Sequence, residues 1–234
     1  MPAPVRFFNG VNNAVRYSTL QDAGMLDPSR YIVDFEDFHK YAAGDWTVTE
    51  TQAGATQALS SANGAGGVML LTNSAADNDV NQLQRTVESF KFVSGKQTWF
   101  KCRFKISDAT ETDVYVGLII TDTDLVGGIT DGMYFVKADG AATVALTTTM
   151  NSTAVSSSAL ATLVADTYVV LGFHYDGIST IKAYVNDVQV STISGVLGTS
   201  ICNDEELAVT LSLTNGAAAA KTMAIDYVLA VQER

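Results

Sequence analysis

Residues 168–190 read YVVLGFHYDGISTIKAYVNDVQV, and this stretch indicates the fold class. Apolar side chains recur at every second position of its first half: Val169, Leu171, Phe173 and Tyr175. A period of two is that of a β-strand with one face in a core. Asp176-Gly177 and Asn186-Asp187 then mark tight turns, because these residues tolerate a positive φ. Strands joined by such short turns pair antiparallel, since parallel pairing needs a long crossover.

The same period continues through the chain after residue 30. Strong strands are predicted in four further stretches: WFKCRFKI (99–106), DVYVGLII (113–120), 207–213 and MAIDYVLAVQ (223–232). Weaker strands are predicted at 31–36, 46–50, 67–72 and 82–92. Positive-φ turns are also predicted at Asp131-Gly132, Asp139-Gly140 and Asn215-Gly216. No long amphipathic helix is predicted, so the strands are expected to close as two packed sheets.

Composition and charge limit the class of protein. The chain has 234 residues, 47% hydrophobic and 17% charged, which suits one large β domain with its own core. A net charge of −11 repels phosphate backbones and argues against nucleic-acid binding. No apolar stretch approaches the roughly 18 residues of a membrane span, and MPAPVRFFNG lacks the apolar core of a signal peptide. We therefore expect assembly in a reducing cytoplasm, which favours free thiols at Cys102 and Cys202 over a disulfide between them.

Residues 1–30 are predicted to form an irregular arm in front of a single β-sandwich domain at 31–234. The arm carries three basic and two acidic residues, whereas the remainder carries 11 and 23. An arm of this charge suits an acidic partner, and packing on its own domain or on a neighbour are equal alternatives. The arm residues proposed as partner contacts are Arg6, Phe7, Phe8, Val11, Arg16, Tyr17, Leu20, Met25 and Leu26.

The series of strands resembles the concanavalin A-like (laminin-G-like) jelly roll over residues 31–234. The stretches that carry the resemblance are WFKCRFKI, DVYVGLII, DGMYFVKADG, YVVLGFHYDGISTIKAYVNDVQV and MAIDYVLAVQ. The resemblance implies an all-β, antiparallel two-sheet jelly-roll sandwich, and such a fold does not by itself fix a function. The Thr-, Ala-, Gly- and Ser-rich style, without an export signal, also resembles tailed-phage virion proteins, among them capsid decoration and head-associated proteins.

The resembled family includes glycoside hydrolases with a Glu-x-Asp-x-x-Glu strand, and retaining hydrolysis needs two carboxyl groups about 5–5.5 Å apart. The most similar strings here are DFED at 34–37 and DEE at 204–206. Asp34 and Glu36 are expected to share a strand face, but no second Glu follows at the family's spacing. A Gly-x-Ser-x-Gly elbow and a phosphate-binding loop are also missing from the sequence. We therefore expect no enzyme activity.

Asp122 and Asp124 lie in an oxygen-rich loop after an apolar strand. Such loops suit calcium, but the EF-hand pattern is absent and no closing Glu follows Gly127-Gly128. The pair predicts a solvated acidic turn, with calcium binding as the alternative, and no other metal or cofactor is expected. His174 falls on the outward face of its strand and is expected to be exposed.

Basic residues are concentrated on one face of the strand at 99–106, namely Lys101, Arg103 and Lys105. One interpretation is protection of an edge strand against aggregation. The other is a docking stripe for an acidic neighbour. Separately, four aromatic residues are candidates for stacking on sugar rings: Trp46, Tyr115, Tyr134 and Tyr184.

The leading hypothesis is a non-enzymatic virion structural protein that decorates a phage capsid. Its arm would dock on the major capsid protein or another virion protein, and the protein would form a homo-oligomer, with a trimer as one symmetric arrangement. Binding only the assembled state would stabilise the shell. The protein would be made in the host cytoplasm and reside on the capsid surface. The alternative is a carbohydrate-binding, lectin-like module that contacts a glycan, which a virion surface would also accommodate.

Overall fold

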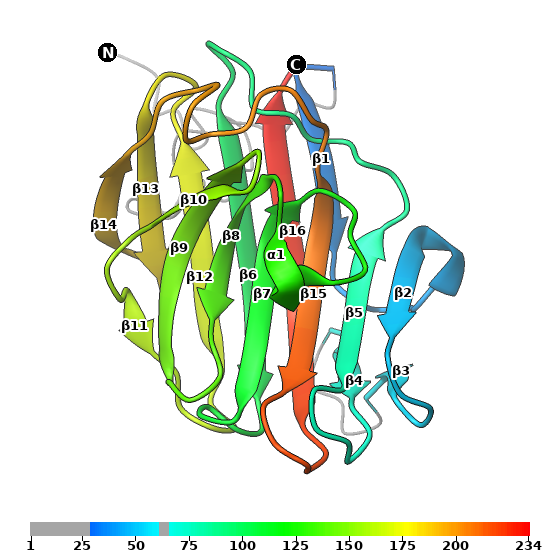
Figure 1. Cartoon of the computed structure of the whole chain (residues 1–234). Coiled ribbons are helices and arrows are strands. Elements are labelled where there is room, and N and C mark those ends of the chain that lie inside the picture. Colours follow the sequence, from blue (N-terminus) through cyan, green and yellow to red (C-terminus); the bar gives the residue numbers. More distant parts are fainter. Residues whose placement is uncertain (1–28, 61–65) are drawn as a thin grey trace, which may run out of the picture.

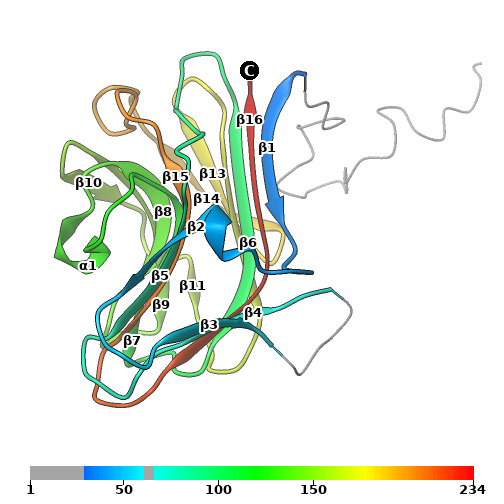
Figure 2. The same cartoon turned by 90° about the vertical axis from the view of Figure 1, so that its right-hand side faces the viewer.

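A computed structural model of the chain describes residues 29–60 and 66–234. The expected all-β, antiparallel two-sheet sandwich is confirmed, with eight strands in each sheet. Figure 2 shows the two sheets as adjacent layers, with the strands running along both. Within the described part of the chain, neither short helix is long and apolar enough to span a bilayer. The predicted arm lies outside the described residues, apart from its last two.

The strands of the first layer follow the order β14 (Val188–Ser194), β13 (Thr180–Val185), β12 (Val169–Tyr175), β6 (Thr98–Ile106), β16 (Thr222–Glu233), β4 (Met69–Thr72) and β3 (Thr56–Leu59). This layer is named the β6 sheet. β16 pairs with β6 along one side. Its other side pairs with β4 at 222–225 and with β1 (Tyr31–Glu36) at 228–233. The closing strand of the chain therefore lies in the middle of this sheet (Figure 1).

The strands of the second layer follow the order β10 (Thr153–Ser156), β9 (Thr143–Met150), β8 (Gly132–Lys137), β7 (Thr112–Ile119), β15 (Ala208–Asn215), β5 (Val80–Arg85) and β2 (Trp46–Glu50). This layer is named the β7 sheet. β11 (Ala161–Thr162) pairs with β9, and a 3-10 turn η1 (Ala43–Asp45) precedes β2. The single-turn helix α1 (Leu125–Gly128) lies on the side of the β7 sheet that faces away from the β6 sheet (Figure 2).

The core lies between the layers and is built from the predicted alternating residues. Phe100 of β6 stacks on Phe173 of β12, with ring centroids 5.4 Å apart. Phe135 of β8 reaches Phe173 from the opposite layer, at 6.2 Å. Each of these rings is at most 1% exposed, and burial of one such side chain stabilises the fold by roughly 1.5–3 kcal/mol. The period of two in the sequence thus corresponds to the faces that join the sheets.

Most of the predicted turns have the expected backbone, and one does not. Asn186 and Asp187 both have positive φ, and so do Gly140 and Gly177. Gly216 is not among the positive-φ residues. A Cβ there would lie 1.8 Å from Oδ1 of Asp139, so a larger residue would require the exposed Asp139 side chain to move.

Two departures concern strands. The strand predicted at 82–92 is observed as β5 and ends at Arg85, because the following residues leave the sheet and Phe90 forms an isolated bridge to Leu207. β3 (56–59), β9, β10 and β11 carried no prediction of their own. β9 reads TVALTTTM. Val144, Leu146 and Met150 contact the core, but Thr148 interrupts their alternation within the run Thr147–Thr149, so the apolar period is too short to stand out.

Candidate functional site

Asp34 and Glu36 share a strand face, as expected, and both bind Arg85 of the other sheet. Nε and Nη2 of Arg85 each donate to Asp34 at 2.8 Å, and Nη2 also donates to Glu36 at 3.3 Å. Burial lowers the pKa of Arg85, but the hydrogen bonds and charges of the two carboxylates outweigh burial and raise it. The most plausible catalytic pair from the sequence is therefore held in an ion-pair cluster that joins β1 to β5.

Trp46, a candidate sugar contact, lies beneath this ion-pair cluster. The guanidinium carbon of Arg85 is 4.1 Å from the Trp46 ring centroid, a cation–π contact. Trp46 is only 4% exposed and stacks with Phe38 at 6.2 Å. Its ring thus supports Arg85 from within and is not open to a ligand from the surface.

The second acidic string, 204–206, lies at the surface. Glu206 accepts a hydrogen bond from Nζ of Lys91 at 3.0 Å, and this bond lowers the pKa of Glu206. Asp204 accepts from the side-chain amide of Asn151 at 3.3 Å. The string therefore binds neighbouring polar groups and lies on a different part of the chain from Asp34.

Tyr115 and Tyr134, two further candidate sugar contacts, lie side by side on the outward face of the β7 sheet. Their ring centroids are 6.1 Å apart, and the Tyr134 hydroxyl hydrogen-bonds with Thr149 at 2.9 Å. Burial raises the pKa of Tyr115 to about 12 and also raises that of Tyr134. Both rings are less than 10% exposed. The structure brings these two residues together but does not leave them open.

Residues 120–131 cover this outward face. Leu125 of α1 and Ile129 pack against the two tyrosines in one buried cluster. Below the segment, Gln84 donates to the Ile120 carbonyl at 3.2 Å and accepts from the Asp122 amide at 3.0 Å. Gln82 donates to the Asp122 carbonyl at 2.5 Å. The chain's own loop thus occupies the face on which the two tyrosines and the polar side chains of β5 meet.

Asp122 and Asp124, the candidate calcium ligands, both serve this covering segment. Asp122 accepts a hydrogen bond from the Asp124 amide at 3.0 Å. Asp124 is the N-cap of α1 and accepts from the Gly127 amide at 2.8 Å. Across residues 29–60 and 66–234, no three His, Cys, Asp or Glu side chains gather as a metal-binding group. The two carboxylates act as turn and cap acceptors.

Lys101, Arg103 and Lys105 share the outward face of β6, as predicted. Lys101 pairs with Asp187 at 2.6 Å, and Arg103 pairs with Asp226. The guanidinium carbon of Arg103 lies 4.1 Å from the ring centroid of Tyr168. Because β6 lies between β12 and β16, the edge-protection interpretation is wrong.

Tyr184 and His174 also lie on the outward side of the β6 sheet, and both are buried. His174 was predicted to be exposed, but it is only 3% exposed, so that prediction is wrong. Its ring stacks on Trp99 with centroids 5.0 Å apart, and its Nε2 lies 2.7 Å from Oε1 of Gln97. Alternation identified the side of the sheet, but neighbouring aromatic side chains decide the exposure.

A pocket of about 280 Å³ opens between β1 and the residues that follow β5. Its polar lining includes Asp34, Asp45 and Arg85, and Thr86 and Ser89 also line it. Its apolar wall is formed by Ile32, Val33, Val87 and Phe90. The sequence carried no signal for this pocket, since its walls come from three separate segments without a shared motif.

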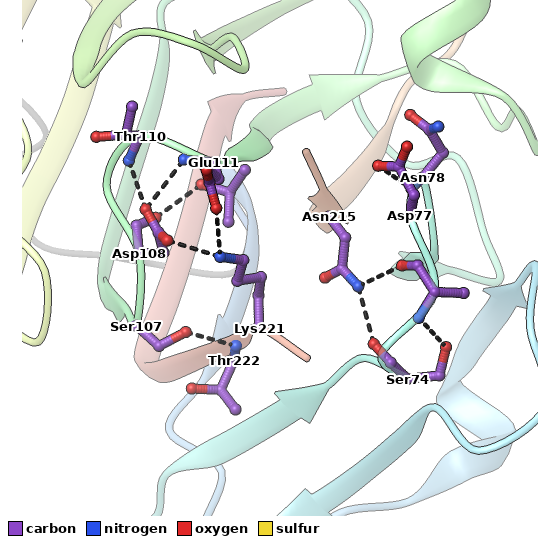
Figure 3. A network of polar contacts seen from close by, with 12 residues as sticks. Ser74, Asp77, Asn78, Ser107, Asp108, Thr110, Glu111, Asn215, Lys221 and Thr222 are labelled. Carbon is purple, nitrogen blue, oxygen red and sulfur yellow. Dashed lines mark hydrogen bonds and ion pairs between the residues drawn. The ribbon is translucent and has the colours of Figure 1, made fainter. Parts of the chain in front are cut away.

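A polar network ties together the turns at one end of the sandwich (Figure 3). Nζ of Lys221 donates to Asp108 at 2.6 Å and to Glu111 at 3.2 Å. The Lys221 hydrogen bond, joined by two backbone amides, lowers the pKa of Asp108 to about 2. Nearby, Nζ of the fully buried Lys137 donates to the carbonyls of Thr110 and Thr112. These groups satisfy one another, which is typical of a structural network.

Both cysteines are free and buried. Cys102 lies on the core face of β6, and burial raises its pKa. Burial raises the pKa of Cys202 to about 12. Neither thiol has the lowered pKa of a nucleophile.

No protein-family model and no curated protein sequence matches the chain. Solved structures do match. A protein of unknown function from Shewanella oneidensis MR-1 has a TM-score of 0.61 at 13% identity, over 90% of this chain and 95% of that one. The β-glucanase of Bacillus licheniformis has a TM-score of 0.60 at 14% identity, over 84% and 96%. Peanut lectin has a TM-score of 0.57 at 11% identity, over 87% and 97%. At these identities the likeness shows the concanavalin A-like fold, which lectins and glucanases share.

Proposed function

We propose that this chain is a non-catalytic structural protein of a tailed-phage virion, docked on the capsid shell as a decoration or head-associated protein. The observation that carries the proposal is that the candidate catalytic carboxylates are already bound within the fold. Asp34 and Glu36 bind Arg85, and the outward face of the β7 sheet is covered by residues 120–131. A sandwich with this arrangement is suited to assembly rather than to hydrolysis.

Exposed apolar residues on β1 support a docking role. Val33 is 38% exposed and Phe35 is 57% exposed, on the outward side of the β6 sheet. The preceding residues 1–30 contain the proposed contacts Phe7 and Phe8. Arm and strand would together bind the major capsid protein or another virion protein at the capsid surface, with several copies arranged by symmetry.

Co-sedimentation with capsids of the phage that encodes the chain tests this proposal. The full chain should bind saturably and in fixed ratio to the capsid subunits. Replacing Phe7 and Phe8 together by serine, or removing residues 1–30, should abolish binding. Val164→Ser is the matched control, because Val164 is 61% exposed and lies on a distant loop. Absence of binding by the full chain would refute the capsid role.

A second candidate function is carbohydrate binding without catalysis. It is favoured by the likeness to peanut lectin and to a glucanase. The chain would then act as a lectin-like module, which a virion surface would accommodate. A printed glycan panel separates the two candidates, and a parallel assay for released reducing sugar tests for hydrolysis. Glycan binding without sugar release is the expected result for this second candidate.

A further inference from the structure

We infer that the pocket between β1 and β5 takes a neutral, hydroxylated ligand about the size of one sugar ring. This inference rests on the carbohydrate-binding candidate and assigns its site. The pocket measures about 280 Å³, near the lower limit of about 300 Å³ for small-molecule sites. It is formed by described residues only, and it is separate from the face that residues 120–131 cover.

Arg85 brings unused hydrogen-bond donors to this pocket. A guanidinium has five N–H groups, and the contacts to Asp34 and Glu36 use only Nε and Nη2. Nη1 has no hydrogen-bond partner within residues 29–60 and 66–234. The carboxylates and the Trp46 ring hold the guanidinium in place, so a ligand oxygen would meet a donor that is already oriented.

Asp45 brings acceptors to the same pocket. Its side chain is exposed and has no hydrogen-bond or ion-pair partner in the described part of the chain. The hydroxyl groups of Thr86 and Ser89 line the same pocket and can donate or accept. Donors and acceptors therefore line the same pocket, together with apolar side chains such as Ile32 and Phe90.

The mixture of charges selects the class of ligand. Two carboxylates, Asp34 and Asp45, and one guanidinium, Arg85, line the pocket. An ammonium ligand would only donate, so it would leave the Nη1 donor of Arg85 without an acceptor, and a phosphate would be repelled by both carboxylates. A sugar hydroxyl donates and accepts at once without a net charge. The C–H face of a sugar ring also suits the apolar wall, and neutral saccharides fit all of these features.

The test begins with a printed panel of neutral oligosaccharides and free glucose, galactose, mannose and N-acetylglucosamine. For each sugar that binds the full chain, affinity is measured for Asp45→Asn and Val87→Asp. Val87 is a suitable rim position because it is 65% exposed, so neither change disturbs the core. Each should weaken binding by about tenfold, the effect of losing roughly 1.4 kcal/mol. Glu205→Gln and Val164→Asp are the matched controls and should bind as the parent does.

NMR gives a second, independent measurement. Sugar binding should shift the side-chain N–H signals of Arg85 and Trp46. The indole signal of Trp99 should stay unchanged, because Trp99 lies on the outward face of the β6 sheet. Sugar binding that survives both pocket variants and leaves Arg85 unshifted would overturn the pocket assignment and leave the carbohydrate function in place. No binding by any sugar of the panel would overturn both.

Discussion

Arg85 of the β7 sheet holds both carboxylate oxygens of Asp34 in the β6 sheet, through two hydrogen bonds of 2.8 Å each. The pair is largely buried, with side-chain exposures of 16% and 22%. It therefore joins the two layers at the side of the sandwich where β1 lies. Two parallel hydrogen bonds from one guanidinium also fix the orientation of the pair.

Asp34→Asn should destabilise the fold by about 2 kcal/mol, because it removes a charged acceptor and leaves Arg85 partly buried without its main partner. Urea unfolding at neutral pH measures the change. Glu205→Gln is the control, since Glu205 is exposed, and it should stay within about 0.5 kcal/mol of the parent. Equal stability of the two variants would mean that the pair does not join the sheets.

The lowered pKa of Asp108 predicts how the stability of the fold changes at acid pH. Its folded pKa of about 2 lies below its ordinary value of 3.8, chiefly because of Lys221. A lowered pKa stabilises the fold at pH above the ordinary value, and this stabilisation is lost as the pH falls through the folded value. The stability gap between the parent and Asp108→Asn should therefore be full at pH 6 and should shrink between about pH 4 and 2. Urea unfolding across this range tests it, and a constant gap would contradict it.

Lys137→Met should lower the melting temperature. The ammonium of Lys137 is the donor to the carbonyls of Thr110 and Thr112, and a buried carbonyl that loses its donor costs about 1–3 kcal/mol. For a chain of this length, that loss of stability corresponds to a fall in melting temperature of roughly 2–12 °C. Calorimetry measures it, with Lys40→Met as the control, because Lys40 is exposed. A variant that melts with the parent would show that water replaces the ammonium.

Leu125→Ala should loosen the covering segment without unfolding the sandwich. Leu125 is 4% exposed and packs on Tyr115 and Tyr134, whereas its neighbour Val126 is 48% exposed. Amide exchange within residues 120–131 should become roughly tenfold faster in Leu125→Ala. The matched variant Val126→Ala should leave it unchanged. Faster exchange over the whole β7 sheet would contradict a locally anchored segment.

Both thiols should resist a disulfide reagent in the folded protein at pH 8. Burial raises the pKa of each, so little reactive thiolate forms. In urea, both should react within the mixing time. Rapid titration of one thiol in the folded state would show that Cys102 or Cys202 becomes exposed by local opening.

The strands could largely be predicted from the sequence, because their apolar residues alternate and the core requires that alternation. The hairpin at Asn186-Asp187 followed from residue type, and both residues have positive φ. β9 was missed since Thr148 interrupts the alternation of Val144, Leu146 and Met150. In such a strand the polar–apolar contrast that marks a buried face is weakened.

The candidate sites could be predicted only in part. Alternation placed Tyr115 and Tyr134 on one face of neighbouring strands, and their rings do meet. Covering by residues 120–131 depends on how a loop folds back, which the period of a strand does not specify. The pocket at Arg85 depends on contacts between segments about 50 residues apart, Asp34 and Arg85 among them. Contacts of that kind follow from the topology and not from local pattern.

The central position of β16 determines when the β6 sheet can form during synthesis of the chain. Tyr31 pairs with Glu233, so β1 must wait for a partner synthesised about 200 residues later. At 5–20 residues per second, that delay is roughly 10–40 seconds. Throughout it, Phe35 and the unpaired β1 segment of the nascent chain are open to chaperones and to other nascent chains. The β6 sheet can be completed only once residue 233 has left the ribosome.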